Sequence, residues 1–395
     1  MAQSSRYSPA TAAEVEQVVA EALAERRSLE VCAGGSKRLM RSPSGAAAAL
    51  DMSAVAGITN YDPDELVVTA RAGTPLIELE AALAQRRQML AFEPFDHAPL
   101  FGSAPGRATL GGVIAANVSG PRRLASGAAR DHILGFTAVS GRGELLKGGG
   151  AVVKNVTGFD LPKLMAGSWG TLAVLLSITM RVLPRPRAEK TLLIRGLSSD
   201  AAQQLMNSAM ATTAAVSAAA HLHAPNPTTA LRIEGFGPSV EVRCGELLRV
   251  LQPAGACETI EAEESSAFWR SVSSLDALPV AGYVLWRISV PSARGAQVPA
   301  QLACEEVRYV SDWGGALVWA AVPESIAVAR GEQIRAVARS LGGYATLIRA
   351  PLAVRAALAA GAGRDPGLTR LHERVKAAFD PCGILNPGLD PAADH

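Results

Sequence analysis

A dense series of glycines, hydroxyls and amides between Pro105 and Asp160 constrains this fold more than any other part of the sequence. Gly111 and Gly112 are followed closely by Asn117 and Ser119. Because glycine has no Cβ, its backbone can approach a ligand closely at little conformational cost. Free N–H groups beside such glycines suit an anionic ligand such as a diphosphate. A single Gly-Gly pair is more simply a turn between strands, but the whole series favours a ligand cradle.

The size and composition indicate two or three domains with a large core. The chain has 395 residues, of which 49% are apolar and 19% charged. Its 38 Lys and Arg residues are balanced by 36 Asp and Glu residues, a net charge of +2, which argues against a nucleic-acid-binding protein. No apolar run approaches the ~18 residues of a membrane-spanning helix, and the first residues lack the apolar core of a signal peptide. We therefore expect a cytoplasmic protein without a transmembrane segment.

The cysteines and histidines predict no metal centre. No Cys-x-x-Cys pair is present, so this chain cannot supply the clustered thiolates of an iron–sulfur centre. Buried free thiols are the expected state of the five scattered cysteines, Cys32, Cys244, Cys257, Cys304 and Cys382. His221 and His223 would share one face of a strand, but two histidines without an obvious third ligand are more often surface or loop residues.

Residues 1–187 alternate between strands and helices. Thr11 and Glu14 form a candidate capping box for a first helix over 11–24. The strand at 28–32 runs into Ala33-Gly34-Gly35-Ser36-Lys37, which taken alone is a weak phosphate-loop signal. Further elements follow: a strand at 65–72, a helix at 75–86, a hairpin of strands 133–140 and 144–147, a helix at 161–166 and a buried strand ending at Leu183.

The character of the chain changes after residues 184–187, whose prolines indicate a linker. Strands and helices then recur in pairs, which favours an α+β domain with an antiparallel sheet. The expected strands are 190–195, 230–236, 283–290, 315–322 and 344–349, and the expected helices are 199–220, which is alanine-rich, 239–251, 331–341 and 368–379. Tight turns follow the last helix, and the amide of Asn386 between them suits hydrogen bonding to a ring or to a loop elsewhere.

Five separated blocks of the sequence form an ordered set. They are Ala33-Gly34-Gly35-Ser36, Gly73-Thr74-Pro75-Leu76, Thr-Leu-Gly-Gly-x-x-Ala-x-Asn over 109–117, Gly170-Thr171-Leu172, and Phe-Asp-Pro-Cys-Gly-Ile-Leu-Asn-Pro-Gly over 379–388. Together they resemble the FAD-binding domain of the vanillyl-alcohol-oxidase-like (PCMH-type) flavoproteins. The resemblance implies an α+β fold with an FAD-binding domain of two α/β subdomains at 1–187, an α+β cap domain with an antiparallel sheet at 188–360, and a C-terminal segment at 361–395 that returns to the FAD domain.

Further motifs narrow the resemblance within that family. They are Ser-Gly-Pro-Arg-Arg over 119–123, Arg130-Asp131-His132, Val-Lys-Asn-Val-Thr-Gly-Phe-Asp over 153–160, and the Asn386-Pro387-Gly388 end. They are most similar to the FAD-binding subunits of bacterial glycolate oxidases, which work with a second, homologous flavoprotein and an iron–sulfur subunit. The resemblance implies oxidation of glycolate, a 2-hydroxy acid, with electrons passing from the flavin to the iron–sulfur partner. It also implies association with the inner face of the membrane through those partners.

The resemblance also implies which residues contact FAD. Those assigned to the diphosphate through backbone N–H groups are Ala33, Gly34, Gly35 and Ser36. Those that would follow the diphosphate and flavin are Pro105, Gly106, Thr109, Gly111, Gly112, Ala115 and Asn117. Those near the isoalloxazine are Ser119, Gly120 and, on the flavin side, Asn386, while Val174 would meet the adenine through its backbone. Relatives with covalent FAD carry His at the place of Ser36, so this chain is expected to bind FAD non-covalently.

The catalytic residues are less well defined by the sequence. Oxidation of a 2-hydroxy acid needs a base for the hydroxyl proton, a cation for the carboxylate and the flavin to accept hydride. The candidate cations for binding the carboxylate are Arg122, Arg123, Lys154 and Arg287. For each of them, the alternative role is a solvated surface charge or a structural ion pair. His132 is the candidate base, with a packing role as its alternative.

Three functions follow from these observations. The cap lacks the His/Glu metal set of related 2-hydroxy-acid dehydrogenases, which favours an electron-relaying FAD subunit whose partner holds the better substrate site. The second is a free-standing FAD oxidoreductase of another 2-hydroxy acid or a sugar alcohol. The third is a scaffold that has kept the fold but lost FAD, and the intact glycine blocks weigh against it.

Overall fold

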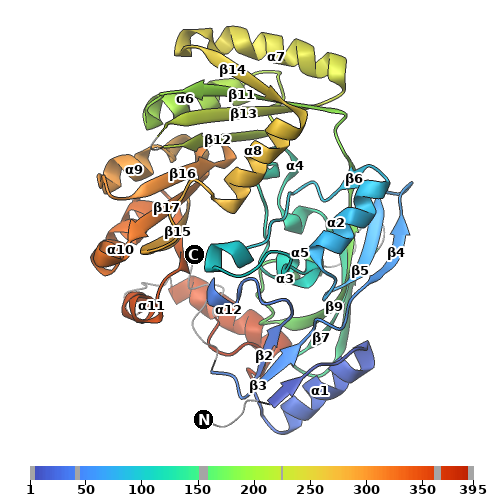
Figure 1. Ribbon diagram of the computed structural model, residues 1–395. Coiled ribbons are helices and arrows are strands. Elements are labelled where there is room, and N and C mark those ends of the chain that lie inside the picture. Colours follow the sequence, from blue (N-terminus) through green and yellow to red (C-terminus); the bar gives the residue numbers. More distant parts are fainter. Residues whose placement is uncertain (1–4, 41–44, 151–158, 224–225, 360–365, 390–395) are drawn as a thin grey trace. The chain divides into compact units, whose positions relative to one another are not determined.

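The protein folds into two compact units with an α+β architecture (Figure 1). The computed structural model describes residues 5–40, 45–150, 159–223, 226–359 and 366–389. Of these, unit 1 contains the residues up to 119, residues 128–185 and residues 366–389, and unit 2 contains residues 120–127 and 186–359. The chain therefore visits unit 2 briefly at 120–127, a crossing that the sequence did not indicate.

A small parallel sheet begins unit 1. Its strand order is β1 (Ser5–Tyr7), β3 (Ala48–Asp51) and β2 (Leu29–Cys32). Helix α1 (Ala12–Ala24) buries Val15 and Val19, one helical turn apart, in the same core as Leu29 and Leu50. Thr11 caps this helix as expected, because its hydroxyl accepts the N–H of Glu14. The Glu14 carboxylate reaches back to the N–H of Ala10 rather than to that of Thr11.

An antiparallel sheet of five strands forms the second part of unit 1. Its order is β4 (Ile58–Asp62), β5 (Val67–Arg71), β9 (Ala173–Arg181), β7 (Ile133–Ser140) and β8 (Leu145–Gly149). Its core includes side chains from α2 (Leu76–Gln85), α3 (Leu110–Ala115) and α5 (Leu161–Met165). The short strands β6 (Gln88–Met89) and β10 (Leu183–Pro184) pair with each other.

Strand β9 joins the two parts of unit 1. Successive side chains of a strand point to opposite faces. Ala173 and Leu175 accordingly belong to the core of the five-stranded sheet, whereas Val174 and Leu176 belong to the core of the parallel sheet. Unit 1 thus consists of two subdomains that share one buried strand.

The C-terminal segment packs within unit 1. It comprises α12 (Pro366–Phe379) and the turns after it. Asp380 is buried and accepts the N–H groups of Ile384 and Leu385. The Lys376 ammonium bonds Asp380 and the carbonyl oxygens of Thr171 and Leu385. These contacts fix the turns against the segment that precedes β9.

Unit 2 is built on one antiparallel sheet of eight strands. Its order is β14 (Cys257–Glu261), β11 (Ala188–Arg195), β13 (Thr228–Gly235), β12 (Ala218–Leu222), β16 (Arg308–Asp312), β17 (Leu317–Pro323), β15 (Tyr283–Ser289) and β18 (Tyr344–Arg349). The antiparallel sheet expected from the sequence is therefore confirmed.

Helices cover both faces of the β11 end of this sheet. Leu192 and Ile194 share a core with α6 (Ser199–Met210) and α7 (Gly237–Leu251), whereas Leu193, on the other face, contacts the core of α8 (Ala262–Ser274). The other helices of unit 2 are α4 (Arg123–Ser126), α9 (Gln297–Leu302), α10 (Glu324–Ser340) and α11 (Leu352–Ala359). No helix in the described ranges is long and apolar enough to span a bilayer.

The prediction of one alanine-rich helix over 199–220 is wrong for the second half of that range. Helix α6 ends at Met210, Ala215 has a positive φ of 51°, and Ala218–Leu222 is strand β12. Ala219 packs into the core under α6 and α7, and Ala218 and Ala220 pack into the core under α8. Burial on both faces of a central strand thus overrides the helix propensity of alanine.

The interpretation of His221 and His223 as surface or loop residues is wrong for His221, whereas His223 lies in the segment after β12 (Ala218–Leu222) and is half-buried. His221 is buried on β12, where its Nδ1 lies 3.0 Å from Oγ1 of Thr229. His223 lies 2.8 Å from the hydroxyl of Ser311 and 3.0 Å from that of Ser199. Burial lowers the pKa of His221 to about 4, and burial together with the field of His221 lowers that of His223 to about 3. Both imidazoles are therefore neutral in the folded protein at neutral pH.

We predict that this pair makes stability depend on pH. Each folded pKa lies below the ordinary value of 6.5, so the unfolded chain takes up protons first as the pH falls. The stabilisation is complete above pH 6.5 and decreases below it, by about 2 kcal/mol per imidazole between neutral pH and about pH 5. Urea titrations at both pH values should show a smaller decrease in the double variant His221→Gln, His223→Gln. An equal decrease in both proteins would contradict the assignment.

Candidate functional site: a glycine-lined pocket in unit 1

A pocket of about 110 Å³ lies in unit 1 between loops from distant parts of the chain. Its lining comes from the end of β2 and the loop after it, from the start of α3, from a turn before β9 and from β9 itself. The lining residues are Val31–Arg38, Met52, Ala72, Arg107, Thr109, Gly111, Gly112, Ala115, Trp169, Gly170, Ala173 and Leu175.

The loop after β2 presents unused backbone donors to this pocket. The N–H groups of Gly34, Gly35, Ser36 and Lys37 donate no hydrogen bond to any described residue. Gly35 has a φ of 73°, a conformation that favours glycine. Ser36 and Lys37 are buried, whereas Gly34 is half-buried and Gly35 exposed. Because buried N–H groups are nearly always paired in proteins, the unused ones of Ser36 and Lys37 at a pocket indicate an acceptor that the chain does not supply.

The loop around Arg107 holds that donor loop in place. A side chain at Gly34 would overlap the carbonyl group of Arg107, so only glycine allows the two backbones to meet there. The Arg107 guanidinium also donates to the Gly34 carbonyl oxygen at 2.7 Å. Asp96 fixes the second loop, because its Oδ2 accepts the N–H groups of Gly106 and Arg107.

The two glycines at the start of α3 have different environments. A Cβ at Gly111 would lie 2.8 Å from both the Cβ and the carbonyl oxygen of Ala72. Gly111 is therefore required for packing within the protein. A Cβ at Gly112 would lie 3.3 Å from the Thr109 hydroxyl and 3.9 Å from Nζ of Lys37. Gly112 is thus less crowded than Gly111, because an added Cβ would press on the Thr109 hydroxyl but would meet no backbone atom.

Asn386 joins the loops that border the pocket. It is 2% exposed, its Oδ1 accepts the N–H of Val31 at 2.8 Å, and its Nδ2 donates to the carbonyl oxygens of Trp169 and Gly170. A side chain at Gly170 would meet this amide at 2.9 Å. The amide thus serves a loop, one of the two uses expected for it, and Asn386 positions the lining rather than forming part of it.

The structure brings together about half of the residues expected to contact FAD. Those that line the pocket are Ala33, Gly34, Gly35, Ser36, Thr109, Gly111, Gly112 and Ala115. Those that do not line it, besides Asn386, are Pro105, Gly106, Asn117, Ser119, Gly120 and Val174.

Most of these other residues have local structural contacts. The Asn117 amide oxygen accepts the N–H of Arg130, and the Ser119 hydroxyl accepts the N–H of Ala129. The Gly120 carbonyl oxygen, in unit 2, accepts the indole N–H of Trp313. Val174 packs in the core of the parallel sheet while its neighbours, Ala173 and Leu175, line the pocket.

The sequence interpretation missed Lys37 and Arg107 as pocket residues. Lys37 is only 7% exposed, although it directly follows the expected loop. A lysine after Gly-Gly-Ser was the available signal, but a lysine is usually solvated and its burial depends on the tertiary fold. Arg107 carried no signal beyond its place between two glycine-rich segments.

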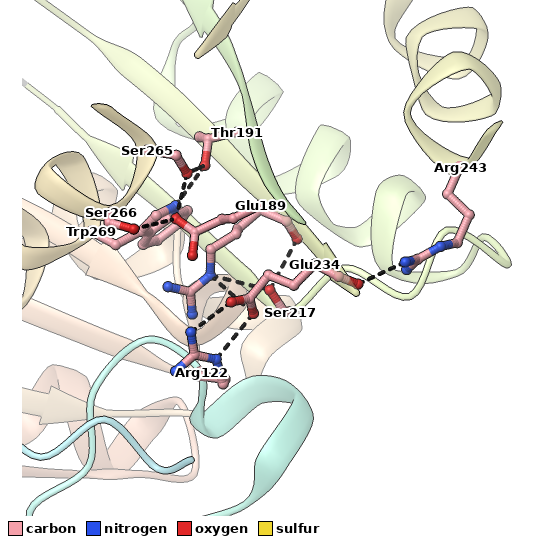
Figure 2. Close-up of polar contacts among 10 residues, drawn as sticks. Arg122, Glu189, Thr191, Ser217, Glu234, Arg243, Ser265, Ser266 and Trp269 are labelled. Carbon is pink, nitrogen blue, oxygen red and sulfur yellow. Dashed lines mark hydrogen bonds and ion pairs between the residues drawn. The ribbon is translucent and has the colours of Figure 1, made fainter. Parts of the chain in front are cut away.

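Arg122, a candidate cation, lies in a buried ion pair within unit 2. Figure 2 shows its guanidinium directed at the carboxylate of Glu234, with contacts of 3.0 Å and 2.6 Å. Burial raises the pKa of Glu234, but the charges of Arg232 and Arg122 and a hydrogen bond from Ser217 outweigh it and hold the pKa at about 2. Arg122 therefore has the structural ion pair that was its alternative role.

The guanidinium groups of Arg123 and Arg287 both lie near the ring of Trp313. On strand β15, Arg287 points away from the core that contains its neighbour Trp286. The Cζ of Arg123 is 4.1 Å from the Trp313 ring centroid, and that of Arg287 is 5.3 Å from it. Tyr344 is adjacent. Burial raises the pKa of its phenol, but the charge of Arg287, hydrogen bonds with Ser289 and Arg287, and the charge of Arg123 outweigh it, so the pKa is below its ordinary value. Two cations thus lie at one indole, and the phenol of Tyr344 interacts with both of them.

The two remaining catalytic candidates are His132 and Lys154. His132 is fully buried, with its ring 5.4 Å from that of Phe92. This environment fits the packing role, since a residue with no exposed surface cannot reach a substrate. Lys154 lies outside the described residues. No group of three His, Cys, Asp or Glu side chains in the described ranges is arranged to hold a metal ion.

Comparison with known proteins is consistent with this pocket. The family of the FAD binding domain matches residues 6–149. Glycolate oxidase subunit GlcE of Escherichia coli (strain K12) is 37% identical over 387 residues, covering 94% of each chain. Glycolate oxidase subunit GlcD of Bacillus subtilis (strain 168) is 28% identical over 52% of this chain and 41% of its own. The solved structure of p-cresol methylhydroxylase with substrate bound has a TM-score of 0.73 at 13% identity, over 98% of this chain and 88% of its own, a likeness in fold alone.

The fold is like that of p-cresol methylhydroxylase, and the matched domain together with the similarity to GlcE defines a flavoprotein that binds FAD. Within that class, the chain belongs to the family of the glycolate oxidase subunit GlcE, and the resemblance noted in the sequence is confirmed. The pocket residues fit the cofactor. Unused N–H groups and the Lys37 ammonium suit its diphosphate, and Ala115, Ala173 and Leu175 offer apolar surface.

We predict opposite effects for the two glycines of α3. Gly112→Val should weaken FAD binding strongly, because its methyl groups would enter the pocket, and should lower the free energy of unfolding less than Gly111→Ala does, because an added Cβ meets closely only the Thr109 hydroxyl. Gly111→Ala should instead lower the free energy of unfolding by about 1–3 kcal/mol through overpacking against Ala72. Flavin absorbance per protein and urea denaturation measure the two effects. Full flavin content in Gly112→Val would contradict the assignment of FAD to this pocket.

We also predict that Arg122 acts on stability. Arg122→Met leaves Glu234 with a weakened set of partners in a buried site and should cost about 3 kcal/mol of unfolding free energy. Arg195→Met, which breaks an exposed pair with Glu258, is the matched control and should cost less than about 1 kcal/mol. Unchanged stability together with lost turnover in Arg122→Met would assign the residue to substrate binding instead.

Proposed function

We propose that this chain is the FAD-binding subunit of a glycolate oxidase complex. The complex oxidises glycolate, a 2-hydroxy acid, to glyoxylate, and electrons pass from the flavin to an iron–sulfur partner subunit. The observation that carries the proposal is the 37% identity to GlcE over 94% of both chains. FAD supplies the hydride acceptor in such a reaction.

The sequence and the pocket support a division of labour in that complex. The five cysteines are scattered and contain no Cys-x-x-Cys pair, so the iron–sulfur centre belongs to another subunit. The second flavoprotein of the complex is homologous to this one, which the similarity to a GlcD subunit supports. The diphosphate loop has Ser36 where covalent attachment would need His, and we expect FAD to be released on denaturation. A cytoplasmic location remains part of the proposal.

The cluster in unit 2 favours a second candidate function, substrate oxidation by this chain itself. Arginine binds a carboxylate through a planar fork, and a phenol of lowered pKa more readily forms the phenolate, which can accept a proton. In this candidate, Arg123 and Arg287 hold the carboxylate of a 2-hydroxy acid, the Tyr344 phenolate accepts its hydroxyl proton, and FAD would accept the hydride. The chain would then be a free-standing oxidoreductase. The loss of FAD by a remnant scaffold is not supported, because the loop of unused N–H groups is intact.

Anaerobic reduction of the flavin distinguishes the two candidates. We predict that glycolate bleaches the visible flavin absorbance of the assembled complex but not that of the purified chain alone. D-Lactate serves as a second substrate in parallel. Bleaching of the isolated chain by either acid would overturn the relay assignment.

If the isolated chain does react, the Arg287→Met variant tests the second candidate. It should raise KM for the 2-hydroxy acid more than it lowers kcat, since the guanidinium would bind substrate before the chemical step. Arg294→Met, an exposed arginine, is the control. Equal kinetics in Arg287→Met and the wild type would exclude the cluster as the substrate site.

A further inference from the structure

Lys37 is a buried cation whose charge the protein itself does not neutralise. The residue is 7% exposed and lines the pocket. Its Nζ donates one long hydrogen bond, 3.3 Å, to the neutral hydroxyl of Ser36, and it forms no ion pair with any described carboxylate. Removing an ammonium from water without a counter-charge is unfavourable, so an anion bound at this place would stabilise the charged form of Lys37.

The other cations of the lining are already engaged elsewhere. The Arg38 guanidinium forms two hydrogen bonds with the carboxylate of Glu30, at 2.9 Å and 2.7 Å. The Arg107 guanidinium is exposed and donates to the carbonyl oxygen of Gly34. Lys37 is thus the buried positive charge that remains for a ligand among the described lining residues.

The surroundings of Nζ indicate a phosphate rather than a flavin ring. Lys37 belongs to the loop of unused N–H groups, and its Nζ lies close to Gly112 and Thr109. Hydroxyl and backbone donors converging with one ammonium match the several oxygens of a phosphate. Oxidised FAD carries its negative charge only on its diphosphate.

We propose that the Lys37 ammonium binds the diphosphate of FAD and is the principal charged contact that this chain makes to the cofactor. The proposal rests on FAD occupying this pocket. It makes Lys37 a cofactor-binding residue in addition to those that the glycine blocks predict.

The test compares FAD binding by flavin-free wild type and Lys37→Met, a variant of similar length without the charge. We expect the dissociation constant to rise by on the order of 10- to 100-fold. Riboflavin, the probe without phosphates, should bind both proteins equally. Lys163→Met removes an exposed charge from α5 and should bind FAD like the wild type. Thermal melting of each variant checks that the fold is retained.

The pH dependence gives a second measurement. Burial lowers the Lys37 pKa to about 8, against the opposing field of Asp96, and a bound anion raises it. FAD affinity should therefore be full below pH 8 and decrease as the pH rises above it, whereas Lys37→Arg should show no such decrease. The other titratable or charged lining groups are Arg38 and Arg107, which stay charged, and Cys32, whose thiol pKa is raised by burial and by Asp51 and Glu30.

The possible results distinguish a failure of the Lys37 assignment from a failure of the assignment of FAD to this pocket. FAD affinity within twofold of the wild type in Lys37→Met, or an equal loss for riboflavin, would overturn the role of Lys37. Undiminished FAD binding by Gly112→Val would show instead that FAD binds elsewhere, which is a failure of the site and not of the lysine alone.

Discussion

The approach of the Gly34 backbone to the Arg107 carbonyl group is the contact on which the site depends. A Cβ at Gly34 would overlap that group, so any other residue would push the two loops apart. With them in contact, the Arg107 guanidinium donates to the Gly34 carbonyl oxygen, Asp96 fixes the second loop, and residues 34–37 line the pocket with N–H groups that no described residue accepts.

The sequence predicted the glycine-rich part of the site better than the charged part. A dense series of glycines is a recognisable signal in a sequence, because it indicates backbone that must approach something closely. The loop at 33–36 and the start of α3 do lie together in the pocket. Arg107 had no signal beyond its place between two glycine-rich segments. Lys37 had a signal in its place after Gly-Gly-Ser, but its burial is decided by tertiary packing. The same limit explains the fold errors. Ala218–Ala220 is helical by propensity, yet it is a strand because both of its faces are buried.

Neighbouring arginines in unit 2 show why residue type alone does not define chemistry. Arg122 and Arg123 are adjacent, and their sequence context is the same. One guanidinium is paired with Glu234 in the interior, and the other lies over Trp313 beside Arg287. Only the helical turn that begins at Arg123 directs the two side chains to different surroundings. Electrostatic partners from strands more than a hundred residues away then separate a structural residue from a candidate for substrate contact.

The hydrogen bonds of Asn386 have a consequence for the order of assembly. Val31 and the Trp169-Gly170 turn are tied together by a side chain that is 355 residues beyond Val31. During synthesis, this link cannot form until Asn386 has left the ribosome, so the 355 residues from Val31 onward are made before the two loops are joined by it.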